Sequence, residues 1–132
     1  MNLNQIITII PNFFSLFYVQ NTGAAFSILS DNTPIIVCIS MAFIVFLDRQ
    51  IEKEKNMTNL LKFSYGIILG GVFGNLVDRA LNHAVIDYLS FQFFHYSFPI
   101  FNLADIAITV GVALVIIDMF LERKKKKGEN HE

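Results

Sequence analysis

The side chains best suited to chemistry in this sequence are carboxylates, amides and one guanidinium that recur in its second half. They are Asn75, Asp78, Arg79, Asp87, Asn102 and Asp105. Two carboxylates held within a few ångströms of each other cannot both remain ionised, so such a pair shares a proton. One member can take a proton from water while the other gives one to a peptide group, which is the chemistry of an aspartic peptidase. Nearby amides and a guanidinium would orient the substrate and stabilise developing negative charge.

Spacing alone leaves open which two of the three aspartates form the pair. Asp78 and Arg79 end an apolar segment, where adjacent opposite charges commonly form an interfacial ion pair. Asp105 lies five residues inside an apolar block, and an ionisable side chain at such a depth usually has a function. Asp87 taken alone would be an ordinary loop acid. His83 and Asp87 are four residues apart but lack a third ligand nearby, so we expect no metal and no other cofactor.

The composition indicates an integral membrane protein. Hydrophobic residues make up 54% of the chain and charged residues 16%, and the mean hydropathy is +0.52. These values lie outside the usual balance of soluble domains, and the apolar residues occur in long blocks. A chain of 132 residues has no room for a separate soluble module, so residues 1–132 are expected to form one membrane domain. The basic residues form only one short run near the C-terminus, which gives no support for nucleic-acid binding.

Three apolar segments are expected to be transmembrane helices, because about 20 apolar residues are needed to cross the hydrocarbon core. They are residues 32–48, 60–78 and 100–121. Residues 1–30 instead alternate apolar runs with turn signals, which predicts two short strands of a half-buried sheet at the membrane surface. Alternation within residues 79–99 predicts another strand of that sheet. The predicted fold is a membrane-embedded α-helical bundle of three transmembrane helices with a small antiparallel β-sheet at the outer membrane surface.

Glycines recur at every fourth position of the second predicted helix, at Gly66, Gly70 and Gly74. A stripe without side chains lets two helices approach closely, so we expect this stripe to pack against a neighbouring helix. Such packing is a structural role and carries no chemistry of its own.

The positions of the cations predict how the chain is oriented. Nine of its ten Lys and Arg residues lie in the link between the first two helices, at the start of the second helix, or in the C-terminal tail at 122–132. These places share one side of the membrane after three crossings, and only Arg79 lies on the other. Because cations concentrate on the cytoplasmic side, we expect a cytoplasmic C-terminus. The sheet, residues 79–99 and the candidate acids would then face the outer leaflet.

Four blocks of the sequence resemble the signature blocks of the lipoprotein signal peptidase (signal peptidase II) family. They are NTGAAF at 21–26, GGVFGNLVDR at 70–79, VIDY at 85–88 and FPIFNLAD at 98–105. The blocks follow the family's order and extend over nearly the whole chain. The resemblance implies a multi-pass aspartic endopeptidase of the bacterial cytoplasmic (inner) membrane. Its substrates would be prolipoproteins, cut just before a diacylglyceryl-modified cysteine, and membrane lipid would be its other partner.

The resemblance also implies a role for each matching residue. Asp87 and Asp105 match the catalytic pair, and Asp78 matches a carboxylate that supports the site. Contacts with substrate are implied for five further residues, which are Asn21, Gly71, Asn75, Arg79 and Asn102. The resemblance thus selects two of the three aspartates, a choice that spacing leaves open.

The sequence departs from that family at its start. Members of the family begin with a further membrane helix ahead of the surface sheet, and we expect that helix to be absent here, which leaves three spans of four. Two other functions stay open, and only the first of them follows from the missing helix. One is a catalytically inactive homologue that binds lipidated peptides, and the other is a small proton-coupled carrier with Asp105 as its relay.

Overall fold

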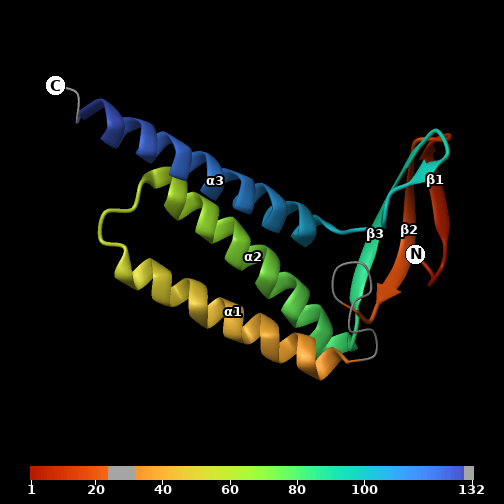
Figure 1. Ribbon diagram of the computed structural model, residues 1–132. Helices are drawn as coiled ribbons and strands as arrows, with labels where there is room; N and C mark the ends of the chain where they lie inside the picture. Colours follow the sequence, from red (N-terminus) through yellow and green to blue (C-terminus); the bar gives the residue numbers. More distant parts are fainter. Residues whose placement is uncertain (24–31, 130–132) are drawn as a thin grey trace.

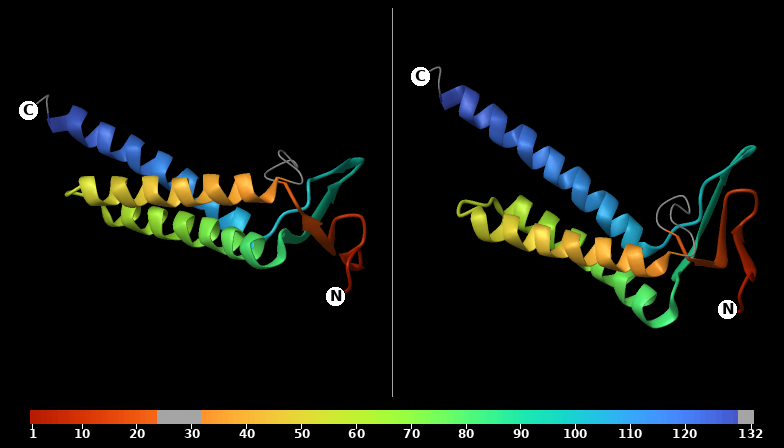
Figure 2. Two further views of the ribbon diagram at one scale, coloured as in Figure 1. Left: turned by 90° about the horizontal axis from the view of Figure 1, so that it is seen from below. Right: turned by 60° about the horizontal axis from the view of Figure 1, so that its bottom comes forward.

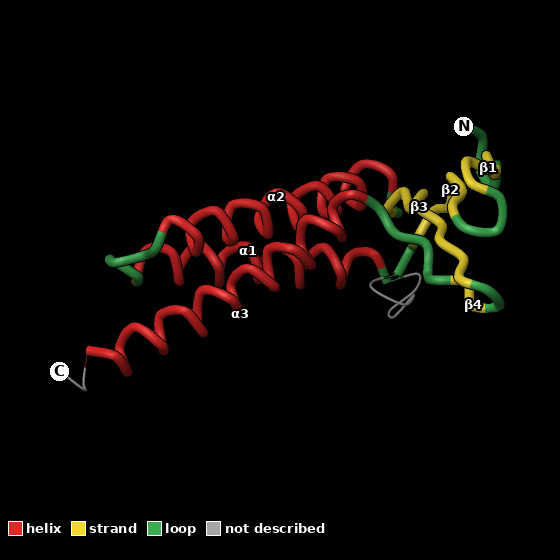
Figure 3. The backbone as a smooth tube through the Cα atoms, turned by 90° about the horizontal axis from the view of Figure 1, so that it is seen from above, coloured by secondary structure: helices red, strands yellow, loops and turns green. Residues whose placement is uncertain are grey.

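Three long helices and a small sheet make up the computed structural model, which describes residues 1–23 and 32–129. Residues 24–31 and 130–132 lie outside the described residues, and they include the end of the block at 21–26 and the end of the predicted tail. The strands gather at one end of the helices, and the last helix ends at the opposite end of the bundle (Figures 1 and 3). This arrangement confirms the predicted bundle of three apolar helices with a small antiparallel sheet.

The helices are α1 (Thr33–Lys53), α2 (Asn59–Asn82) and α3 (Leu103–Glu129). All three are long and apolar enough to cross a membrane. Each helix continues past the apolar segment from which it is predicted. The charged residues that follow lie outside the hydrocarbon core, but the backbone hydrogen bonds of the helix extend through them. Figures 1 and 2 show α2 beside α1 and α3, so α2 is the helix around which the bundle is arranged.

The sheet has the strand order β1-β2-β3-β4, and each strand is antiparallel to the next. The strands are β1 (Ile6–Ile10), β2 (Phe14–Asn21), β3 (Val85–Phe93) and β4 (Tyr96–Ser97). The alternation within residues 79–99 thus corresponds to β3, which pairs with β2. The expectation of a half-buried sheet is wrong for β1, which is exposed at every residue. As the edge strand, β1 has a neighbour on one side only, which is β2.

Two glycines set the close approach of α2 and α3. A Cβ atom added at Gly71 would lie 2.6 Å from the carbonyl oxygen of Ala104, and one at Gly111 would collide with the side chain of Ile68. At Gly66 and Gly70, by contrast, an added Cβ would meet nothing within 4 Å. The expectation that the stripe of every fourth glycine packs against a helix is therefore wrong for these two. The packing face is turned by one residue, or about 100°.

Hydrogen bonds tie the helices together at both ends of the bundle. At the sheet end, the Thr33 hydroxyl at the start of α1 donates to the carbonyl oxygen of His83, 2.9 Å away, just after α2. At the other end, the Thr58 hydroxyl donates to the buried Asp118 carboxylate of α3 and accepts from the Leu61 N–H, which caps α2. Between these ends lies an apolar core centred on Leu47, Ile68 and Val72.

Candidate active site

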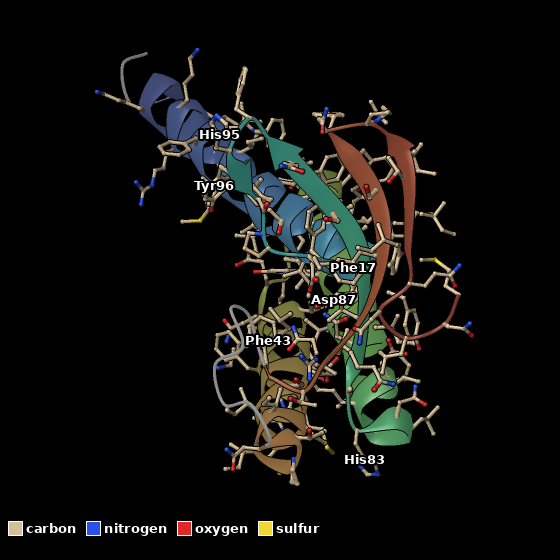
Figure 4. The ribbon with its side chains drawn as sticks, turned by 90° about the vertical axis from the view of Figure 1, so that its right-hand side faces the viewer. Phe17, Phe43, His83, Asp87, His95 and Tyr96 are labelled. Atoms are coloured by element: carbon tan, nitrogen blue, oxygen red, sulfur yellow. The ribbon has the colours of Figure 1, made fainter. Side chains whose placement is uncertain are left out.

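Asp87 is buried where the sheet meets the helices. Helix α2 ends as His83 takes a left-handed conformation with φ of 58°, and β3 begins two residues later at Val85. Val85 and Asp87 point to the same face because side chains alternate along a strand, and both are buried. The Asp87 side chain is only 4% exposed. Figure 4 shows Asp87 between His83, near one end of β3, and His95 and Tyr96 beyond the other end.

Two amide side chains satisfy the Asp87 carboxylate. Asn21 Nδ2 donates to Oδ2 at 2.9 Å, and Asn102 Nδ2 donates to Oδ1 at 3.0 Å. Burial nevertheless raises the pKa of Asp87 above its ordinary value, and the neighbouring Asp105 carboxylate raises it further. The two amide hydrogen bonds and the positive charge of Arg79 lower this pKa and only partly offset the rise.

Asp105 is held by the start of α3. Its backbone N–H donates to Asn102 Oδ1 at 3.0 Å, and its own Oδ2 accepts from the Asn102 N–H at 3.1 Å. This reciprocal pair is a capping box, in which Asn102 precedes the helix and Asp105 is its third residue. The segment before it is fixed as well, because Phe101 pairs with Leu89 of β3, close to Asp87.

Two asparagines link the carboxylates of Asp87 and Asp105. Asn102 Nδ2 donates both to Asp87 and, at 3.0 Å, to Asn75 Oδ1. Asn75 Nδ2 in turn donates to Asp105 Oδ1, also at 3.0 Å. The hydrogen bonds among the described residues therefore run from one carboxylate to the other through two amides. Helix α2, strand β3 and the start of α3 each contribute to this network.

Arg79 places a buried positive charge beside the network. Its Nη2 donates to the carbonyl oxygen of Gly23 at 2.7 Å and its Nη1 to that of Asn75 at 3.3 Å, whereas its Nε has no hydrogen-bond partner among the described residues. Gly23 is positioned by a turn in which its N–H donates to Asn21 Oδ1 at 2.9 Å. Arg79 thus binds the chain that leaves β2 and interacts electrostatically with Asp87 and Asp105.

Asp78 and Gly71 lie further from the network. Asp78 is half-buried, and its negative charge interacts with Arg79. Gly71 is buried against α3, where its lack of a side chain lets Asn75 approach Asp105. The structure therefore brings Asn21, Asn75, Arg79, Asp87, Asn102 and Asp105 together. The catalytic and substrate-binding roles that the resemblance implies for these residues, and for Gly71, stay predictions.

Sequence reasoning missed two parts of this arrangement. One is the backbone carbonyl of Gly23 as the acceptor for Arg79, which no side-chain pattern signals. The other is the capping box, for which the Asn-x-x-Asp spacing at 102–105 was a usable signal.

Comparisons with known proteins identify the family of this chain. A family model described as "Signal peptidase (SPase) II" matches residues 1–121. A lipoprotein signal peptidase of Symbiobacterium thermophilum is 38% identical over 95% of this chain and 82% of its own length. One from Yersinia pestis is 40% identical over 98% of this chain and 79% of its own length.

Solved structures give the same answer for the fold. A bacterial membrane enzyme structure obtained by the in meso method at 2.3 Å resolution matches with a TM-score of 0.87 and 30% identity, over 96% of this chain and 77% of the other. A second, at 1.9 Å resolution, matches with a TM-score of 0.79 and 31% identity, over 90% of this chain and 77% of the other. This chain, a bacterial membrane protein, belongs to the signal peptidase II family.

Proposed function

We propose that this protein is an aspartic endopeptidase in which Asp87 and Asp105 are the catalytic pair. Membership of the signal peptidase II family makes the removal of signal peptides from prolipoproteins its function. The observation that carries the assignment of the pair is the hydrogen-bond network in which Asn102 and Asn75 join the buried Asp87 carboxylate to the half-buried Asp105 carboxylate. A purely structural acid would not require a second carboxylate in the same network.

The environments of the two acids suggest different roles for them. The pKa of Asp87 is raised chiefly by burial, so Asp87 is the member that keeps the shared proton. Asp105 then acts as the base. Its carboxylate takes a proton from a water molecule while the water oxygen bonds to the carbonyl carbon of the scissile peptide.

The remaining steps return both acids to their starting states. Asp87 gives its proton to the carbonyl oxygen as the tetrahedral intermediate forms. When the carbon–nitrogen bond breaks, Asp105 gives the proton it took from water to the leaving amine. Asp87 recovers a proton from the intermediate, and a carboxylic acid and an amine are released. Arg79, through its charge, would stabilise the ionised member of the pair.

The distribution of cations supports a placement for the site. With the tail at 122–132 in the cytoplasm, the sheet end of the bundle faces the outer leaflet. A lipid-modified substrate would then reach Asp87 and Asp105 with its acyl chains in the bilayer and its cleavage site at the surface. Cleavage just before the modified cysteine fits this geometry.

The decisive experiment measures cleavage of a diacylglyceryl-modified prolipoprotein by the protein reconstituted in lipid vesicles. Asp87→Asn and Asp105→Asn should each lower kcat by at least about 1,000-fold, because neither variant can complete the proton transfers. Asp48→Asn, at an exposed acid in α1, is the matched control and should leave the rate unchanged. Retained cleavage by both site variants would overturn the assignment.

The same preparation separates the other two functions. A catalytically inactive homologue would bind the lipidated peptide without cutting it, even with both acids present. A proton-coupled carrier would show pH-driven flux that depends on Asp105 and would cleave nothing.

A further inference from the structure

The hairpin that joins β3 to β4 ends in exposed aromatic side chains. We use the name hairpin tip for its four residues, Phe93, Phe94, His95 and Tyr96. Phe94 is 94% exposed, Tyr96 60% and Phe93 47%. An apolar cluster at a loop end is unusual in water, where such clusters mark interaction sites or promote aggregation.

The backbone of the tip makes an aromatic residue at Phe94 still less expected. The pairs Gln92–Ser97 and Phe93–Tyr96 leave only Phe94 and His95 in the turn. Phe94 has a φ of 53°, in the left-handed region. Turns that need a positive φ at this position favour glycine or asparagine, because a bulky side chain is strained there. Phe94 is therefore a large aromatic residue at a position where both exposure to water and backbone conformation favour a small or polar residue.

The surrounding chain carries no charge that would hold the tip in water. Residues 88–101 contain no Asp, Glu, Lys or Arg, and seven of these fourteen residues are Phe or Tyr. Residues 1–30, which include β1 and β2, are likewise free of these four residue types. Water-exposed sheet edges usually carry charged side chains that prevent association. Phe and Tyr rings without nearby charges instead suit the boundary between lipid headgroups and acyl chains.

Ring contacts fix the base of the tip. Phe93 packs edge-to-face on Phe13 with ring centroids 5.4 Å apart, and Tyr96 packs in the same way on Phe98 at 5.9 Å. Phe13 follows β1, so this contact joins the tip to the first hairpin of the sheet. Neighbouring rings thus hold Phe93 and Tyr96 in place. Phe94, at the end of the hairpin, has no ring contact of this kind among the described residues.

The position of the hairpin completes the argument. The strands cross the end of the bundle, at a large angle to the helices that are able to span the membrane (Figure 1). His95 and Tyr96 lie at the end of β3 far from His83, beyond Asp87 (Figure 4). With the three helices spanning the bilayer, a sheet so placed would lie along its surface, and its hairpin would reach sideways from the bundle over the surrounding lipid.

We propose that the hairpin tip is a membrane anchor that inserts Phe94, with Phe93 and Tyr96, into the headgroup region of the leaflet on the active-site side. The anchor would hold the sheet, and with it Asp87, at a fixed height above the acyl chains. Its occupant is phospholipid. This assignment does not depend on which acids are catalytic.

The absence of tryptophan from the sequence allows a direct test. Phe94→Trp and Tyr96→Trp each give a protein with a single tryptophan. Each variant is reconstituted in lipid nanodiscs that hold one copy of the protein. Lys55→Trp, in the exposed link between α1 and α2, is the water reference, and Phe46→Trp, on an exposed apolar face of α1, is the lipid reference. Tryptophan emission is measured with iodide in the buffer and with phosphatidylcholine brominated near the top of the acyl chain.

At both tip positions we expect at least two-fold quenching by the brominated lipid. We also expect iodide quenching several-fold weaker than at Lys55→Trp. Iodide quenching equal to that of Lys55→Trp, without bromine quenching, would place the tip in water and overturn the proposal. Protection from both quenchers would mean that protein covers the tip, which also overturns it. Repeating the measurement in Asp87→Asn keeps the result independent of catalysis.

Discussion

At the scale of single residues, Asn102 connects the two proposed catalytic acids and Asn75. Its amide nitrogen donates to Asp87 and Asn75, and its amide oxygen accepts from the Asp105 N–H. Each polar atom of this side chain is therefore used, and the residue is only 4% exposed. Such burial argues that Asn102 positions the two acids, a role different from the substrate contact that the resemblance implies.

Replacing Asn102 by alanine should lower kcat by about 100-fold with little change in KM, because positioning acts mainly on the chemical step. The variant also removes a hydrogen-bond donor from Asp87, so the pKa of Asp87 should rise further and the alkaline limb of the pH–rate profile should move to higher pH. Asn82→Ala, at the exposed end of α2, is the control. A lower rate with an unmoved pH profile would argue against positioning.

The raised pKa of Asp87 should also make stability depend on pH. The folded protein holds the Asp87 proton more tightly than the unfolded chain, whose pKa is ordinary. Stability is therefore lost as the pH rises from the ordinary value through the raised one. We expect the midpoint of thermal unfolding to fall across this window in the wild type and to fall less in Asp87→Asn. An equal fall in both proteins would assign the effect to another group.

Catalysis should follow the same titration. The proposed general acid is lost as Asp87 ionises, so kcat should fall as the pH rises through the raised pKa. Initial rates measured across that range in one lipid composition test this, and a rate that stays constant through it would contradict the assignment of Asp87 as the acid.

At the scale of elements, the contact between α2 and α3 determines the distance between Asn75 and Asp105. The close approach depends on Gly71, whose missing side chain leaves room for the carbonyl oxygen of Ala104. Gly70, one residue earlier, faces open space. The two glycines therefore form a matched pair for separating helix packing from helix propensity.

Gly71→Ala should destabilise the protein by about 1–3 kcal/mol, since the new methyl group overlaps a backbone atom that cannot move aside. Gly70→Ala should be neutral or stabilise it by up to about 1 kcal/mol, because alanine is the better helix former. Free energies of unfolding in the same detergent test both. Similar values for the two variants would mean that α3 is not held against Gly71 as the structure has it.

The sequence predicts where the helices and strands lie along the chain better than it predicts which side of each one packs against its neighbours. Length and apolar character identify the three helices, and alternation in Leu89, Phe91 and Phe93 identifies β3. The spacing of glycines, however, could not tell which face of α2 meets α3, because that depends on the partner's surface at Ala104 and Ile108. Tertiary contacts of this kind are absent from local patterns.

The sequence predicts the region of the candidate site but not which of its acids form a pair, because pairing also depends on tertiary contacts. Polar residues near the ends of apolar segments mark it, yet spacing could not choose among Asp78, Asp87 and Asp105. The structure separates them by their partners, because amide donors reach Asp87 and Asp105. Asp78, one position away from Arg79 on α2, interacts with Arg79 electrostatically. Resemblance to a family supplied what local patterns lacked.

At the scale of the whole molecule, the proposed catalytic residues lie where the sheet meets the helices, and the cationic last turns of α3 lie at the opposite end of the bundle (Figure 3). With Cys38 replaced by serine, a cysteine introduced at Lys127 should react with a membrane-impermeant maleimide only after the cytoplasmic side is opened. One introduced at the exposed Leu81, near the sheet end of α2, should react in intact spheroplasts. The reverse labelling pattern would show that the protein has the opposite orientation in the membrane and would contradict the proposal.

The pairing of β2 with β3 also has a consequence for how the protein is made. Strand β2 comes before α1 and β3 comes after α2, so their pairing must wait until both intervening helices have been synthesised and inserted. Asn102 and Asp105 emerge later still. A ribosome-bound chain that ends before residue 102 would therefore lack both Asn102 and Asp105, so the proposed catalytic pair cannot assemble until the start of the last helix has been made.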